Sequence, residues 1–124
     1  MGKRVLIAED EPHLVESLRF ILSREGYDIA IALDGEAALQ AIWTASPPLD
    51  LILLDVMLPK KNGFEILKQI RADARLKALP VIVLTAKGQS QDRATALDLG
   101  ADLFLTKPFS NKAVVAAVKR LAAG

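Results

Sequence analysis

The 124-residue chain contains no cysteine, which excludes disulfides, thiolate catalysis and zinc–thiolate sites. No apolar run approaches the roughly 20 residues of a membrane-spanning helix, so no membrane contact is expected. A dominant charge is missing too, because 16 Lys and Arg stand against 15 Asp and Glu. The resulting net charge of +1 gives no reason to expect direct nucleic-acid binding. The composition, 52% hydrophobic and 25% charged, is typical of a globular protein with one core.

The N-terminus shows no targeting segment. Residues 1–4 run directly into the apolar residues 5–8, which leaves no room for a signal peptide. We therefore expect a cytoplasmic protein.

Short apolar runs alternate with helical patterns along the whole chain. Helical patterns begin near Pro12, Gly35, Gly63 and Ser90, and a last one follows Ser110 as a candidate N-cap. The strand-like runs are Val5–Ala8, Tyr27–Ala32, Leu51–Leu54, Val81–Leu84 and Asp102–Leu105. Five such units with short connections predict one α/β domain over residues 1–124, a doubly wound five-stranded parallel sheet with helices on both faces.

The fourth predicted helix has a thin apolar face, with Ala94 and Leu97 and little else. Because less burial holds it to the sheet, we expect it to move more readily than the other helices. The large aromatic residues Tyr27 and Trp43 are expected to be packing residues.

Polar side chains follow the predicted strands at the edge where α/β sheets carry their ligands. After the first strand come Glu9, Asp10 and Glu11, a segment that repels phosphate but attracts a hard cation. Asp10 and Asp55, from strands one and three, would suit Mg²⁺, which takes one or two carboxylates. The alternative is simple capping, because acidic residues before Pro12 also favour a helix N-terminus.

Three further strand ends carry Asp55, Thr85 and Lys107. A terminal Thr is usually a turn residue and a Lys is usually solvated, so each alone is weak evidence. Together with the acidic loop they supply a nucleophile, a cation site and two donors for phosphoryl oxygens. This combination predicts a phosphoryl-transfer site, where positioning and charge neutralisation do most of the catalysis.

Over nearly its whole length the chain resembles the receiver domain of two-component response regulators, a family with the CheY-like (βα)5 fold. The motifs that carry the resemblance are Glu9-Asp10, Leu-Leu-Asp55 followed by Pro59 and Gly63, Leu-Thr85-Ala86, Gly100-Ala101-Asp102, and Lys107-Pro108-Phe109.

The resemblance implies that Asp55 is the phosphoacceptor, taking its phosphoryl group from a sensor histidine kinase, a phosphotransfer protein or a small acyl phosphate. Asp10, Asp55 and the backbone carbonyl of Met57 would ligate Mg²⁺, and Glu9 would act through a metal-bound water. Many members carry Asp at the position of Glu9.

The resemblance also implies a switch. Lys107 would pair with Asp55 at rest and with the phosphoryl oxygens afterwards, and the Lys107-Pro108 bond would be cis. Thr85 would move to hydrogen-bond the phosphoryl group, and Phe104 would turn inward as Thr85 withdraws. The fourth helix, fifth strand and fifth helix would then form the output surface for an unknown partner.

Two positions should tune the phosphoryl lifetime, Met57 and Lys87. Because an apolar Met57 offers no group to orient an attacking water, we expect slow autodephosphorylation: a signalling switch, not an enzyme with turnover.

Family members that dimerise for DNA binding carry charged residues on the output face. Here Leu103, Ala113 and Ala117 replace some of them, which predicts a monomer or weak dimer. With so few residues after Lys107 we expect no effector domain, so the chain would be a stand-alone receiver or one cut from a larger regulator or hybrid kinase.

Three alternatives stay open. A phosphohydrolase with an aspartyl nucleophile would need an acid two residues later, where Met57 stands. A flavodoxin-like cofactor binder is opposed by the acidic first loop and by the lack of a Ser/Thr/Gly phosphate loop. A degenerate receiver that acts only as a docking module is disfavoured because the four site residues are present.

Overall fold

The computed structural model describes residues 2–86 and 90–122 of the chain. Its elements, in chain order, are β1 Arg4–Ala8, α1 Pro12–Arg24, β2 Asp28–Ala32, α2 Gly35–Thr44, β3 Leu51–Asp55, α3 Gly63–Ala72, β4 Val81–Thr85, α4 Ser90–Asp98, β5 Leu103–Thr106 and α5 Asn111–Ala122. Each predicted strand and helix is therefore confirmed, with ends shifted by one or two residues at most.

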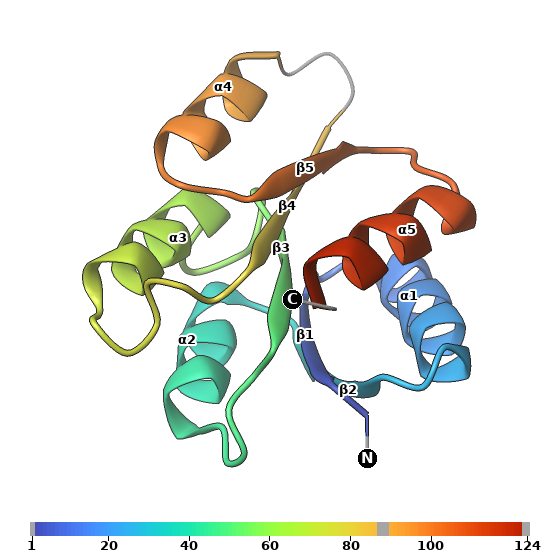
Figure 1. Ribbon diagram of the computed structural model, residues 1–124. Coiled ribbons are helices and arrows are strands. Elements are labelled where there is room, and N and C mark those ends of the chain that lie inside the picture. The colour runs from blue at the N-terminus through green and yellow to red at the C-terminus, as the bar shows by residue number, and fades with distance from the viewer. Residues whose placement is uncertain (1, 87–89, 123–124) are drawn as a thin grey trace.

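All strand pairs are parallel, in the order β2-β1-β3-β4-β5. Helices α1 and α5 cover one face of the sheet, while α2, α3 and α4 lie on the other (Figure 1). The central strands β3 and β4 are buried along their whole length, as expected for a sheet covered on both faces. The doubly wound architecture is confirmed, and its parallel register brings the carboxyl ends of the strands to one edge.

Helix α1 shows how local sequence sets an element's ends. Pro12 occupies its first turn, and the Glu11 carboxylate accepts hydrogen bonds from the backbone N–H groups of His13 at 3.1 Å and Leu14 at 2.8 Å. Beyond the helix, Gly26 adopts a positive φ of 93°, which glycine tolerates without steric cost. The capping interpretation of the acidic segment is thus correct for Glu11 and leaves Glu9 and Asp10 for the site.

Helix α4 is thinly packed, as predicted, but its inward-facing residues were predicted wrongly. Ala96 is buried and Leu99 packs against the core, whereas Ala94 and Leu97 are exposed. Because the few apolar residues of this segment are not confined to one helical stripe, their spacing does not determine which side meets the sheet.

The prediction for Trp43 was also wrong. Its side chain is 47% exposed, while Ile42, one residue earlier, is buried. Successive helical residues point about 100° apart, so the burial of Ile42 turns Trp43 away from the core. Tyr27, by contrast, packs against the α1–α5 side of the core.

Arg71, near the end of α3, connects this helix to the segment before β4 and to the turn before β5. Its guanidinium donates to the carbonyl oxygens of Gly100 at 2.9 Å, Lys77 at 3.1 Å and Leu79 at 2.7 Å, and to Asp102 Oδ2 at 2.9 Å. The same Asp102 oxygen accepts the backbone N–H of Val81, where β4 begins. This arrangement, the Arg71 clamp, fixes the entry into β4 and the turn before β5.

Over residues 2–86 and 90–122, none of the helices combines the length and the hydrophobicity of a membrane span.

Candidate functional site

The residues predicted for the site meet at the carboxyl edge of the sheet. Asp55 is the last residue of β3 and Thr85 the last of β4, and both are buried. The residues that follow β1 and β5 continue the backbone hydrogen bonding of the sheet: Glu9 N–H donates to Ala32 O of β2 at 3.1 Å, and Lys107 N–H to Thr85 O of β4 at 2.7 Å. Backbone pairing of the strands therefore brings these residues to the same edge.

Three carboxylates form an acidic cluster at this edge. Oxygens of Glu9, Asp10 and Asp55 lie within 4.8 Å of one another. Asp10 is exposed, whereas Glu9 is 1% exposed. Within the cluster, Glu9 Oε2 accepts the backbone N–H of Glu11 at 3.1 Å, and Asp55 Oδ1 accepts that of Met57 at 3.3 Å. The predicted convergence of strands one and three is thus realised.

Lys107 supplies the positive charge of the site. Its Nζ lies 2.9 Å from Glu9 Oε1 and 3.3 Å from Asp55 Oδ1, and its side chain is 29% exposed. Burial on its own lowers the pKa of the Lys107 ammonium, but contact with Glu9 and the charge of Asp55 outweigh it and raise the pKa. Lys107 is therefore a fixed cation at neutral pH.

Glu9 is the carboxyl group of the cluster whose ionised form is disfavoured by its surroundings. Burial raises the pKa of its carboxyl above the ordinary 4.5, and the charge of Asp55 raises it further, against the opposing effects of Lys107 and the Glu11 amide. Although Glu9 Oε1 lies near the Lys107 ammonium, it has no well-directed hydrogen bond among the described residues. A buried carboxylate oxygen left in this way costs free energy unless another partner compensates it.

These features fit a bound Mg²⁺ ion. One ammonium cannot balance three neighbouring carboxylates, and oxygen donors are what this hard cation prefers. Such an ion could bind the buried Glu9 oxygen, which lacks a well-directed hydrogen bond, on the side of the protein. It could bind the exposed carboxylate of Asp10 on the side of the solvent. The donor set is therefore suitable for the ion that the sequence predicts.

The hydroxyl of Thr85 lies toward β5. Its Oγ1 lies 3.5 Å from both the carbonyl oxygen of Leu105 and the hydroxyl of Thr106, the outer limit of a hydrogen bond. The hydroxyl is thus only weakly held toward β5. Phe104 is half-buried against the α2–α4 side of the core, and the Arg93 guanidinium of α4 lies 5.6 Å from its ring centroid.

The loop between β3 and α3 packs directly against Asp55. Gly63 N–H donates to Val56 O at 2.9 Å, and a Cβ on Gly63 would come within 2.5 Å of Asp55 O. Asn62 caps α3 by accepting Glu65 N–H at 3.0 Å. Only glycine permits so close a backbone approach here, which explains its place in the motif.

The remaining predicted positions differ in how far the structure describes them. Met57 projects from the same loop with its side chain 73% exposed, while Lys87 lies outside the described residues. The Lys107-Pro108 bond is cis, as the resemblance implied. Lys60, which has a positive φ of 70°, is engaged by Asp34 at 3.6 Å and by Glu36 of α2 at 3.9 Å.

Sequence reasoning missed one contact of the site and one at the opposite end of the strands. It paired Lys107 with Asp55 alone, although Glu9 is nearer, and it did not identify the Arg71 clamp. No periodicity in the sequence reports either contact; the only signal for Arg71 is a basic residue in the last turn of a helix.

The structure combines a five-stranded doubly wound sheet with Asp55, Thr85, Lys107 and an acidic cluster at its carboxyl edge, the arrangement that the resemblance to receiver domains implied. Comparison with known proteins agrees: the sequence model of the response regulator receiver domain matches residues 5–119. The chain belongs to this family.

Individual relatives support the assignment. The alkaline phosphatase synthesis transcriptional regulatory protein PhoP of Bacillus subtilis is 46% identical over 121 residues, which cover 98% of this chain and 49% of that protein. The chain thus spans about half the length of this curated relative.

Solved structures show the same fold. A response regulator of Chloroflexus aurantiacus superposes with a TM-score of 0.93 at 32% identity, over 100% of both chains. The receiver domain of a sensor histidine kinase from Pseudomonas aeruginosa superposes with a TM-score of 0.89 at 28% identity, over 100% of both chains; that structure holds a magnesium ion in its active-site cleft.

Proposed function

We propose that this receiver domain accepts a phosphoryl group on Asp55 and thereby switches a surface formed by α4, β5 and α5. The observation that carries the proposal is the position of Asp55: buried at the end of β3, 3.3 Å from the Lys107 ammonium and in one cluster with Glu9 and Asp10. A buried Asp with only a structural role would also pair with Lys107, but it would not need two further carboxylates beside it.

In the proposed reaction a carboxylate oxygen of Asp55 attacks the phosphorus of a phosphohistidine or a small acyl phosphate. The new O–P bond forms as the bond to the donor's nitrogen or oxygen breaks, and the leaving group keeps the electron pair. Because the pKa of Lys107 is raised, its ammonium stays protonated and can neutralise charge on the phosphoryl oxygens. Positioning and charge neutralisation of this kind are the main catalytic needs of phosphoryl transfer.

Asp10, Asp55 and the Met57 carbonyl would hold Mg²⁺, with Glu9 reaching it through a water. When bound, the ion supplies additional neutralisation of charge on the transferring group. The chemistry of the donor set supports this assignment, as does the magnesium ion in the Pseudomonas aeruginosa receiver structure.

The proposed switch starts from the weakly held Thr85 hydroxyl. A phosphoryl group adds charge and three acceptor oxygens at Asp55, and Thr85 can exchange two contacts of 3.5 Å for a shorter one to these oxygens. Phe104 would then move inward from beneath Arg93. Helix α4 can follow because few of its side chains are buried.

For partners, we propose a sensor histidine kinase or a phosphotransfer protein as donor and an unidentified protein at the output surface. The transcriptional role named for PhoP is that of the relative; for this chain we propose no direct DNA contact, a monomer or weak dimer, and a cytoplasmic location.

Incubation with acetyl phosphate, read by intact mass with and without Mg²⁺, tests the proposal. We expect a Mg²⁺-dependent gain of one phosphoryl group in the wild type and in Asp28→Asn, an exposed aspartate at the start of β2, and none in Asp55→Asn. Because Asp28→Asn makes the same chemical change away from the site, it controls for general effects of an Asp-to-Asn substitution. Absence of the adduct in the wild type would overturn the proposal and favour the docking module.

A further inference from the structure

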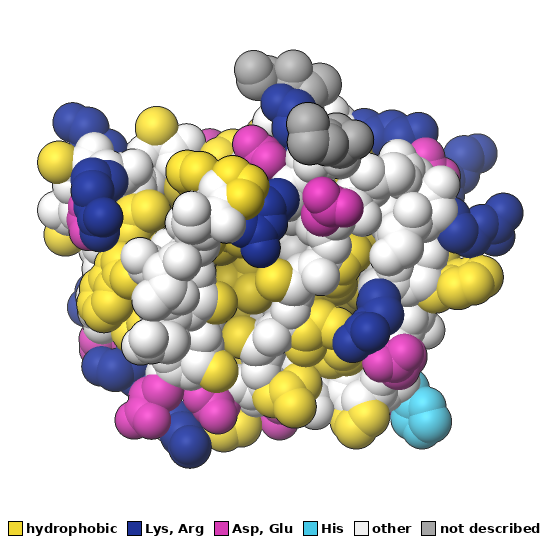
Figure 2. Space-filling model, turned by 90° about the horizontal axis from the view of Figure 1, so that it is seen from below, with side chains coloured by type: hydrophobic (Ala, Val, Ile, Leu, Met, Phe, Trp, Pro, Cys, Tyr) yellow, Lys and Arg dark blue, Asp and Glu magenta, His cyan; other side chains and the backbone are white. Residues whose placement is uncertain are grey.

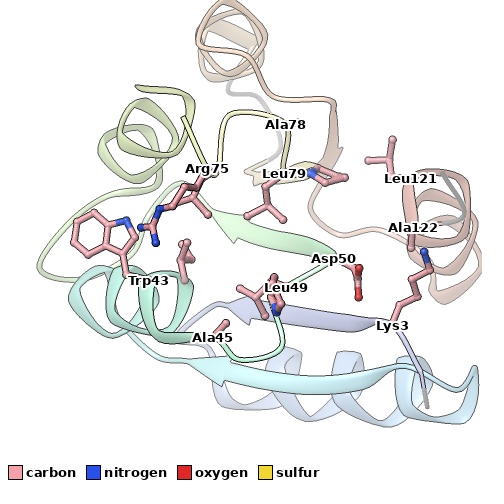
Figure 3. A pocket seen from close by; sticks show the side chains of 14 residues that line it. Lys3, Trp43, Ala45, Leu49, Asp50, Arg75, Ala78, Leu79, Leu121 and Ala122 are labelled. Atoms are coloured by element: carbon pink, nitrogen blue, oxygen red, sulfur yellow. The ribbon is translucent and has the colours of Figure 1, made fainter. Parts of the chain in front are cut away.

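A cavity of about 490 Å³ lies at the amino ends of the strands, away from the edge that carries Asp55. Fourteen residues line it (Figure 3). They come from the segments just before β1, β3 and β4 and from the ends of α2 and α5. The cavity is thus built from several elements of the fold.

The cavity has an apolar middle and charged ends. Leu49 and Leu79 lie between the two ends in Figure 3, with Trp43 and Arg75 at one end and Lys3 beside Asp50 at the other. The face drawn in Figure 2 likewise shows hydrophobic side chains across its middle and charged ones mainly around its edge. Its volume falls in the range of about 300–1,000 Å³ typical of small-molecule sites, which combine apolar walls with a few polar groups.

The two ends of the cavity differ in how their charges are paired. The Asp50 carboxylate is already engaged, because its Oδ2 accepts the backbone N–H of Arg4 at 2.7 Å. Arg75 has a loose ion pair with Asp73 at 3.5 Å and a side chain open to solvent. Lys3 has no ion pair among the residues that the structure describes. At one end of the cavity Lys3 therefore lies beside an ionised carboxylate, whereas at the other end the several donors of Arg75 have only one loose partner.

Trp43 gives the cavity a flat apolar wall. It is the only Trp of the chain, and about half of it remains exposed where a packing role would bury it. The Arg75 side chain points toward its ring in Figure 3. An indole face beside a guanidinium suits an aromatic ring that carries a negative group, through stacking and charge together.

We propose that this cavity is a binding site for a small organic anion with a flat aromatic body, such as an aromatic carboxylate. The ring would lie against Trp43 and over Leu49 and Leu79, and the carboxylate would meet Arg75, which lies at the same end of the cavity as Trp43. This inference does not depend on phosphorylation of Asp55, which lies at the opposite end of β3.

The test is a titration of the ¹⁵N-labelled, unphosphorylated protein with 2-naphthoate, followed by ¹H–¹⁵N NMR spectra. The single Trp43 indole N–H gives one resonance that reports directly on the cavity. We expect saturable shifts of this resonance and of the Leu49 and Leu79 amides, and clearly weaker binding of the uncharged isostere 2-naphthamide. Shifts confined to the site edge around Asp55 would overturn the proposal.

Matched variants distinguish binding at the proposed site from non-specific attraction of the anionic probe to surface cations. Arg75→Gln removes the exposed cation that would meet the carboxylate, and should weaken 2-naphthoate binding by about two- to fivefold, the effect of an exposed charge contact. Lys3→Gln removes the lining cation at the other end of the cavity and should weaken binding less. Lys77→Gln makes the same change in an exposed residue next to the cavity that does not line it, and should leave binding unchanged. Ala78→Phe, from an exposed position on the lining, should block the cavity.

Three further results would overturn the proposal. The first is no saturable shift of the Trp43 resonance at millimolar 2-naphthoate, and the second is equal binding of 2-naphthamide. The third is shifts that follow protein concentration instead of probe concentration, which would assign the cavity to contact between two copies of the chain. Spectra of the variants without probe show whether each remains folded.

Discussion

Lys107 Nζ lies closer to Glu9 Oε1, at 2.9 Å, than to Asp55 Oδ1, at 3.3 Å. The cation is therefore shared between the proposed phosphoacceptor and a second, deeply buried carboxylate. Because burial and the charge of Asp55 raise the pKa of Glu9 despite this contact, the ionised Glu9 is a net cost to the folded state until a further cation joins it.

The first prediction concerns the pH dependence of stability. A carboxyl whose pKa is higher in the folded than in the unfolded state binds more protons when folded, so its contribution destabilises the fold as pH rises. For Glu9 this loss should begin near the ordinary value of 4.5 and be complete above its raised pKa. In EDTA, Glu9→Gln should therefore lose less stability than wild type between about pH 4.5 and pH 8, measured by thermal unfolding.

Glu16→Gln, an exposed change on α1, serves as the control and should follow the wild-type curve. If Glu9→Gln and wild type ran parallel over this range, the raised pKa of Glu9 would be wrong.

The second prediction is stabilisation by Mg²⁺. A ligand that binds only the folded state stabilises it, by about 2.7 kcal/mol at a hundredfold excess over its Kd. We expect Mg²⁺ to raise the melting temperature of wild type and of Asp28→Asn, and to have little effect on Asp10→Asn. An equal rise in the melting temperature of Asp10→Asn would show that the Asp10 carboxylate is not a ligand of the metal.

The third prediction concerns the Arg71 clamp. Arg71→Ala should reduce the free energy of unfolding by about 1–2 kcal/mol, because the carbonyl of the buried Leu79 and three acceptors on exposed residues lose their donor together. Arg71→Lys should recover little of it, since one ammonium cannot replace a planar fork that reaches four oxygens. Urea unfolding measures both.

The exposed Arg75 is the matched control for Arg71. It has one loose ion pair, with Asp73, so Arg75→Ala should change the free energy of unfolding by less than about 0.5 kcal/mol. Similar losses for the two arginines would show that the clamp contributes little.

The edge of the sheet was predictable because each polar site residue stands within two positions of the end of an apolar run. A strand's end is visible in sequence as the point where hydrophobicity stops, and parallel pairing then brings Asp55, Thr85 and Lys107 to one edge. The local signals of helix ends, such as Pro12 in the first turn of α1, were equally readable.

Contacts between side chains of distant segments were not predictable in the same way. The choice of Lys107 between two carboxylates depends on differences of a few tenths of an ångström. The partners of Arg71 lie up to 31 positions away, and the inward side of α4 depends on tertiary packing because its own apolar pattern is too sparse. Sequence patterns reveal which residues are buried through the spacing of apolar residues. The partners of Lys107 and Arg71 and the inward side of α4 leave no such spacing.

The fourth prediction tests the packing of the β3–α3 loop on Asp55. In Gly63→Ala the added Cβ would lie 2.5 Å from Asp55 O, so the backbone at the phosphoacceptor must shift. Phosphorylation by acetyl phosphate should slow several-fold, because displacements well below 1 Å matter in such sites. The rate of adduct formation by intact mass measures it.

Asn62→Ala separates this local effect from lost stability. It removes the cap of α3, which costs about 1 kcal/mol, without adding an atom against Asp55. The prediction for Gly63 would be wrong if Asn62→Ala, at equal folded fraction, slowed phosphorylation as much.

The last prediction concerns the lifetime of the phosphoryl group. Met57 stands two residues after Asp55 with its side chain largely exposed, and its thioether is at most a weak acceptor that cannot orient an attacking water well. Met57→Asn places an amide there, so the phosphorylated protein should lose its adduct several-fold faster than wild type after removal of the donor. Met57→Leu, which keeps an apolar side chain, should retain the wild-type lifetime. Equal lifetimes for Met57→Asn and wild type would show that water reaches the phosphoryl group without help from this position.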